Sequence, residues 1–295
     1  MIYDITLKIE YLYQSPVSKG RHTVCVAPST IDGVQRLLAS DIAFDPEPDE
    51  KTERQDFFGN HIVDIGLAHE HAGTGLAATF RVERLQAALE VSRSLPFADL
   101  PATLTKCRSM KAASPLHFLA ASPRVSLSPL IGAFARDAAG APHSVFDAVL
   151  AVGQALFHRM TFDATATDVD TSPEEAFTNG SGVCQDFAHI MIAALRSLGI
   201  PAGYVSGYLR TLPPEGMERL EGADAMHAWV RAWCGDALGW VEFDPTNDLF
   251  VGTDHIVAAY GRDYSDVAPI RGVVRLSGAQ DSTHSVDVAP VPEPA

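Results

Sequence analysis

Three residue types that together can transfer an acyl group occur in separate stretches of the chain: Cys184, His227 and Asp244. A thiol can attack a carbonyl carbon, an imidazole can accept and return a proton, and a carboxylate can orient the imidazole and stabilise its charge. The pattern therefore predicts a cysteine nucleophile, a histidine base and an aspartate, provided that folding brings the three segments together.

The cysteine stands where a glycine-rich turn, residues 180–182, meets a predicted helix. From Cys184 onward, apolar residues recur at spacings of three and four and make one buried face. Gly199 and Pro201 end this helix. A thiol at a helix start lies beside unpaired N–H groups at the positive end of the helix dipole, and both favour the thiolate.

His227 and Asp244 lie at the ends of two strand-like segments, residues 228–234 and 239–243. A turn at residues 235–239 allows the segments to be antiparallel neighbours. Strands in a sheet lie about 4.8 Å apart, so the carboxylate can meet the imidazole.

Two polar residues near Cys184 have simpler explanations than catalysis. His189 is five positions along the helix, which turns it about 140° from the thiol, so we expect it to pack elsewhere. Asp186 is expected to interact with the helix dipole rather than to take a proton.

No metal or cofactor site is predicted. His69 and His71 flank Glu70, but no third and fourth ligand follow at a helpful spacing. Three further cysteines fit small core residues, and no CxxC pair or disulfide framework is expected; they are Cys25, Cys107 and Cys234.

Several blocks of the chain resemble the core of the transglutaminase-like superfamily, which has a papain-like thiol fold. They are residues 182–188, 199–208, 227–229 and 244–247. Residues 261–269 resemble its bacterial branch, which carries an all-β N-terminal region. The resemblance implies a nucleophile at a helix N-terminus packed on an antiparallel sheet. The chain departs from the branch at Gln185 and Gly203, where arginine is commoner. The resemblance therefore indicates the type of reaction better than the substrate preference.

The expected fold is α+β, with a β-sandwich followed by this core. Short alternating segments, and a hairpin signal at Gly59-Asn60, predict the sandwich for residues 1–92. Residues 93–290 are expected to form the catalytic domain and residues 291–295 a tail. Within the catalytic domain we expect a surface loop at 211–225, a helix capped by Ser144, a short helix capped by Ser172, and a closing hairpin from 273–276 and 285–288.

Composition excludes some partners. The 295-residue chain carries a formal charge of −15, which repels nucleic acid and anionic lipid. No apolar run approaches a membrane span, and the charged residues Asp4, Lys8 and Glu10 argue against a signal peptide, so we expect a cytoplasmic protein. The oligomeric state stays open.

The expected activity is cysteine-dependent acyl transfer through a thioester, with hydrolysis of a peptide or amide bond favoured. Two alternatives remain: a protein-glutamine gamma-glutamyltransferase that joins a primary amine to the acyl group, and a catalytically idle module that binds peptide. The expected partners are therefore a peptide or protein substrate and, for the first alternative, an amine.

Overall fold

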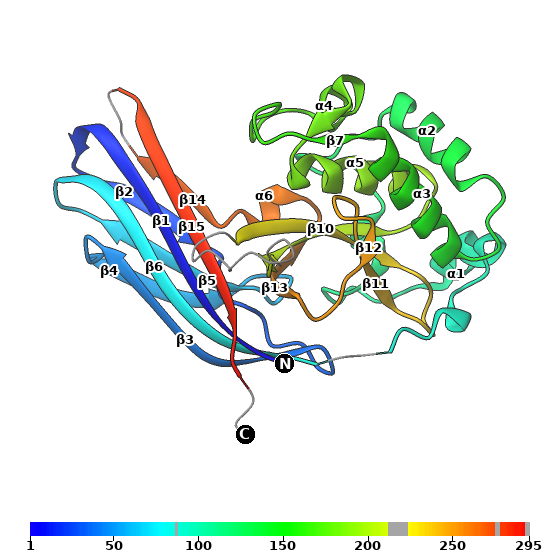
Figure 1. The fold of residues 1–295 in the computed structure, drawn as a ribbon, viewed down its shortest axis with the longest axis horizontal. Helices are drawn as coiled ribbons and strands as arrows, with labels where there is room; N and C mark the ends of the chain where they lie inside the picture. The colour runs from blue at the N-terminus through cyan, green and yellow to red at the C-terminus, as the bar shows by residue number, and fades with distance from the viewer. Residues whose placement is uncertain (86–87, 212–223, 275–277, 293–295) are drawn as a thin grey trace, which may run out of the picture.

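Alternating apolar and polar residues build an N-terminal β-sandwich, seen on the left of Figure 1. The computed structural model describes residues 1–85, 88–211, 224–274 and 278–292. One sheet of the sandwich has the strand order β15-β1-β6-β3 and the other β14-β2-β5-β4. The strands are β1 (Ile2–Val17), β2 (Gly20–Val24), β3 (Gln35–Asp45), β4 (Glu50–Gln55), β5 (His61–Leu67), β6 (His71–Arg84), β14 (Ile270–Val274) and β15 (Gln280–Pro290).

The two C-terminal strands complete the sandwich. β14 pairs with β2, and β15 pairs with β1 over eleven residue pairs from Tyr3 to Tyr13. The predicted closing hairpin is wrong, because β14 and β15 lie in opposite sheets. The sequence-based boundary put both strands in the catalytic domain, whereas their pairing joins them to the sandwich. Val286 and Val288 alternate with more exposed residues, and their buried face fills the sandwich core.

A five-stranded antiparallel sheet forms the centre of the second half of the molecule, with the order β12-β11-β10-β9-β13. The predicted neighbours β10 and β11 are joined by the expected turn, where the Cys234 amide donates to the Gly239 carbonyl. Most of the predicted loop at 211–225 lies outside the described residues. The strands are β9 (Ala202–Leu209), β10 (Ala225–Trp233), β11 (Trp240–Asp244), β12 (Leu249–Phe250) and β13 (His255–Gly261).

Helices cover one face of this sheet (Figure 1). The predicted caps are present: Ser144 accepts from the Asp147 amide at 3.1 Å, and Ser172 accepts from the Glu175 amide at 3.2 Å. The covering helices are α2 (Pro129–Ala139), α3 (Val145–Arg159), α4 (Pro173–Asn179) and α5 (Cys184–Ser197). The remaining elements are η1 (Val91–Arg93), η2 (Phe97–Asp99), α1 (Leu100–Lys106), η3 (Pro115–Phe118), β7 (Thr161–Phe162), β8 (Ser181–Gly182) and α6 (Tyr264–Val267).

The sandwich packs directly against the five-stranded sheet. Its apolar core includes Tyr208 from β9 and both Ile256 and Ala258 from β13. The Tyr208 hydroxyl also donates to the Val26 carbonyl across 2.7 Å. The position of β13 therefore depends on the sandwich as well as on its own sheet. Among the described residues, no helix has both the length and the apolar character needed to cross a bilayer.

Candidate active site

The start of α5 is built to hold Cys184 in a fixed place. Asp186, in the first turn, accepts the Val183 amide at 2.8 Å and the Thr167 hydroxyl at 2.6 Å. A Cβ at Gly182 would lie 2.5 Å from the Asp186 carboxylate, so glycine is required there. Asp186 thus caps the helix. Cys184 is half-buried and is the first residue of α5, beside the backbone N–H groups at the helix start.

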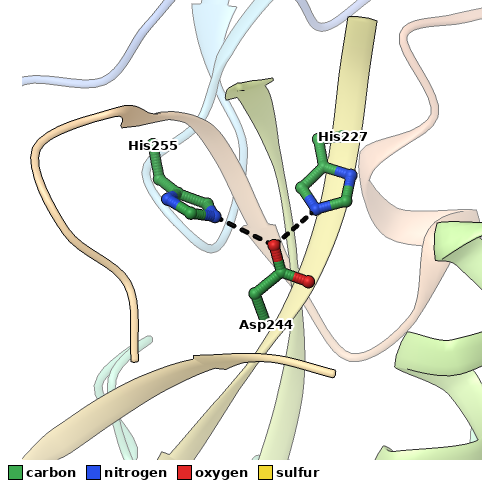
Figure 2. A group of neighbouring side chains, drawn as sticks. All are labelled: His227, Asp244 and His255. Carbon is green, nitrogen blue, oxygen red and sulfur yellow. Dashed lines mark hydrogen bonds and ion pairs between the residues drawn. The ribbon is translucent and has the colours of Figure 1, made fainter. Parts of the chain in front are cut away.

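His227 and Asp244 meet at one end of the sheet, because β10 begins where the antiparallel β11 ends. The Nε2 atom of His227 lies 2.7 Å from Oδ2 of Asp244 (Figure 2). The Asp244 side chain is fully buried. Its Oδ1 atom accepts the amides of Thr246 and Asn247 at 2.9 and 3.3 Å.

The carboxyl of Asp244 remains ionised. Burial by itself raises the pKa of this carboxyl, but hydrogen bonds from His227 and His255 outweigh burial and hold the pKa far below its usual range. The Asn247 side chain adds a further donor, 2.7 Å from Oδ2. A fixed negative charge therefore faces the imidazole of His227.

The imidazole of His227 also interacts with Cys184. Burial lowers the pKa of His227, but hydrogen bonds with Asp244 and with the Cys184 side chain reverse this and raise the pKa to about 10. Because Asp244 takes Nε2, Nδ1 is the nitrogen available to the sulfur. The structure thus brings the three predicted residues together, with the imidazole of His227 between the Cys184 sulfur and the Asp244 carboxylate.

A further histidine, His255, contacts Asp244, and the sequence did not predict this contact. His255 begins β13, is 3% exposed, and lies with Nε2 3.0 Å from the same Oδ2 atom of Asp244. Figure 2 shows the two imidazoles reaching this oxygen from different strands. In the sequence His255 stands before a uniformly apolar strand, and no motif or periodicity connects it to Asp244.

The ligand atoms of His227, Asp244 and His255 lie within 4.8 Å of one another, a grouping that could hold a metal ion. The local geometry fits hydrogen bonding better. Oδ2 already faces N–H donors from both histidines and from Asn247, and a cation would have to displace these hydrogen bonds.

His189 and the paired histidines of the sandwich lie outside this site. His189 is buried on α5 and accepts the Tyr264 amide at Nε2 across 3.2 Å, as its place on the helix predicts. His69 instead lies 3.0 Å from Asp49, and the Nδ1 atom of His71 contacts the His69 carbonyl.

The remaining thiols have different surroundings. All four cysteines are free, and Cys25 and Cys234 are buried. Burial raises the pKa of each of these two thiols to about 12. Cys107 is half-buried and lies 3.8 Å from the Ser114 hydroxyl.

Comparison with known proteins identifies the family. Residues 132–245 match the transglutaminase-like superfamily, and residues 3–83 match the bacterial transglutaminase-like N-terminal region. An uncharacterized protein of Mycobacterium tuberculosis is 30% identical over 301 residues, which cover 98% of this chain and 92% of the relative. The chain belongs to the transglutaminase-like superfamily. The predicted family is therefore confirmed.

Two further proteins are similar to this member of the superfamily. A Cytophaga hutchinsonii protein proposed to be a cysteine protease shares the fold, with a TM-score of 0.77 and 24% identity over 100% of this chain and 92% of that protein. The predicted α+β fold is thereby confirmed. A protein-glutamine gamma-glutamyltransferase of Pseudomonas aeruginosa is 38% identical over 87 residues, or 29% of this chain and 13% of that enzyme. Together the matches support a cysteine-based enzyme of this superfamily.

Proposed function

We propose that this protein is a cysteine hydrolase that cleaves a peptide or amide bond through a thioester. The supporting observation is the hydrogen-bonded row at the start of α5, in which His227 interacts with both Cys184 and the buried Asp244. The row supplies a nucleophile, a proton carrier and an orienting carboxylate.

The first half of the reaction makes the acyl-enzyme. The Cys184 thiolate attacks the carbonyl carbon, and the oxygen that gains negative charge accepts a hydrogen bond from the Cys184 backbone N–H. The C–N bond then breaks as His227 gives its proton to the departing nitrogen. An amine or ammonia leaves, the substrate acyl group remains as a thioester, and Asp244 keeps the imidazole oriented.

The second half releases the acid. Water attacks the thioester carbonyl while His227 accepts one of its protons. The C–S bond breaks, which regenerates the thiolate and the protonated imidazole. The product is a carboxylic acid, and the charges and protons of the site return to their starting arrangement.

The second candidate is protein-glutamine gamma-glutamyl transfer. The likeness to the Pseudomonas aeruginosa transferase over 87 residues favours this alternative. The first half-reaction is shared, and a primary amine replaces water in the second. The two candidates therefore differ only in the fate of the thioester.

The test offers the enzyme a peptide library in which many members contain glutamine, with and without monodansylcadaverine, and follows products by mass spectrometry. Hydrolysis predicts shortened peptides with new carboxyl termini, or glutamine converted to glutamate. Fluorescent adducts instead support the transferase. Cys184→Ala is the control and should form neither product. Peptide binding without any product in the wild type would contradict both and favour an idle binding module.

A further inference from the structure

A second imidazole contacts the carboxylate that orients His227. The His255 Nε2 atom lies 3.0 Å from Oδ2 of Asp244, on the oxygen that also contacts His227. An ionised carboxylate only accepts, so His255 must donate from Nε2. Its Nδ1 atom is buried and has no hydrogen-bond partner among the described residues. An N–H group at Nδ1 would be a buried donor without an acceptor, which costs more free energy than an unprotonated nitrogen at the same place.

The two histidines therefore have different capacities. His227 has a partner for each ring nitrogen, Asp244 on one side and Cys184 on the other, and can carry a positive charge with both N–H groups satisfied. Among the described residues, the His255 ring has one hydrogen-bond partner only. His227 is suited to move protons, and His255 is suited to hold the carboxylate in place.

Sheet topology brings these residues together. His227 begins β10, Asp244 ends β11 and His255 begins β13. Since neighbouring strands are antiparallel, the start of β10, the end of β11 and the start of β13 all lie at the same end of the sheet. The indole of Trp229 packs edge-on against the His255 ring, with centroids 5.2 Å apart, and so limits its rotation.

The sandwich holds the strand that carries His255. The Gln35 side chain donates to the Val257 carbonyl at 2.7 Å and accepts the Val257 amide at 2.9 Å. Asn60 pairs in the same two-way manner with the backbone of Tyr260, at 2.8 Å in each direction.

The chain just before His255 is fixed from the same side. The Tyr3 hydroxyl donates to the carboxylate of Asp254 at 2.9 Å, and Arg84 donates to the Gly252 carbonyl at 2.9 Å. Sandwich side chains thus bind this segment both before and after His255.

We propose that His255 is a positioning residue, through which the N-terminal sandwich fixes the Asp244 carboxylate that holds His227. The inference rests on the proposed function and gives the sandwich a role in the chemistry. Without the His255 donor, the carboxylate loses one of the groups that set its orientation, and His227 is aimed less well at Cys184. Groups that orient metal-bound histidines in the same indirect way are typically worth about 10-fold to 100-fold in affinity or activity, and we expect a loss of similar size here.

The test uses iodoacetamide, which reports on Cys184 whether or not a substrate is known. In the full-length protein, His255→Phe keeps a ring but removes the donor, and His255→Gln keeps an N–H donor. We expect His255→Phe to slow alkylation of Cys184 at pH 7 by about tenfold. His255→Gln should restore the rate to within about threefold of wild type, a rescue that packing alone does not predict.

A matched control separates positioning from stability. Leu76→Ala removes buried apolar atoms from β6 in the sandwich core and leaves the residues of β13 and the carboxylate unchanged. It should lower the unfolding temperature and leave the alkylation rate unchanged. On the peptide substrate found by library screening, His255→Phe should lower kcat and leave KM nearly constant. A wild-type alkylation rate in a folded His255→Phe variant would overturn the proposal.

A measurement on the wild type covers the case in which His255→Phe does not fold. Nitrogen-15 spectra of the histidine rings, assigned with His255→Gln, should show a slowly exchanging Nε2 proton on His255. A rapidly exchanging proton would contradict the hydrogen bond to Asp244. If neither the wild type nor any variant turns over peptide, while the alkylation rates differ as expected, the result would count against the proposed function. The positioning role would still hold.

Discussion

The indole of Trp229 on β10 occupies the space that a side chain at Gly207 of β9 would need. A Cβ atom at position 207 would lie 2.5 Å from the indole and would also meet the Ile256 carbonyl. The same indole packs against His255, so the small size of Gly207 affects both the sheet and the site.

Gly207→Ala should therefore destabilise the protein by about 1 to 3 kcal/mol, because overpacking forces the ring or a strand to shift. Urea unfolding measures the effect. Gly252→Ala is the matched control, since no atom of the described residues lies within 4 Å of its added Cβ. Equal stability of the two variants would contradict the packing argument.

Asp244→Asn should abolish most activity while the fold persists. The amide has no charge to stabilise the imidazolium of His227 and presents an N–H group where the histidine needs an acceptor. We expect kcat to fall by about 10³-fold to 10⁴-fold. Glu242→Gln is the control, because this carboxylate lies on the same strand but contacts Trp229 and Tyr260 instead. Activity above a tenth of wild type in Asp244→Asn would exclude the role.

Stability should fall on mild acidification because of His189. Burial lowers the pKa of His189 from 6.5 to about 4 in the folded state. The unfolded chain therefore takes up the proton first, so the stability contributed by neutral His189 is complete above pH 6.5 and is lost as the pH falls toward 4. Between pH 7 and pH 5 this amounts to about 2 kcal/mol.

His189→Gln should remove that part of the pH dependence, since its side chain does not titrate. Urea unfolding at pH 7, 6 and 5 gives the slope. The exposed His143→Gln variant should keep the wild-type slope. Identical slopes for His189→Gln and wild type would refute the assignment.

The four thiols should separate clearly by reactivity at pH 6. Burial raises the pKa of Cys25 and Cys234 to about 12, so both should stay unmodified in the folded protein. Cys184, paired with the imidazolium of His227, should react with iodoacetamide at least about tenfold faster than the half-buried Cys107. Peptide mass mapping over time gives each rate.

His227→Gln supplies the control for this experiment. The substitution removes the positive partner and should bring the rate at Cys184 close to the rate at Cys107. Equal rates for these two thiols in the wild type would be evidence against an activated cysteine.

The sequence was most informative where structure is local. The helix after Cys184 follows from the spacing of its apolar residues and its glycine-rich approach. The meeting of His227 and Asp244 follows from two strands joined by a short turn. These relationships depend on residues that are neighbours in the chain, or nearly so.

Long-range pairing escaped the same reasoning. His255 reaches Asp244 because β13 pairs with β9, two strands away from β11, and alternation within β13 does not reveal its neighbour. The partners of β14 and β15 lie more than two hundred residues earlier in the chain, so their nearness to each other in sequence wrongly suggested a hairpin.

The pairing of β15 with β1 has a consequence for synthesis. β1 is translated well before its neighbour β15, residues 280–290. β15 follows only after all strands of the five-stranded sheet have been translated. Until then one backbone edge of β1 stays open to any other extended peptide. Nascent chains halted near residue 260 should therefore be prone to stick together, and chaperones that shield such edges should matter most in that interval.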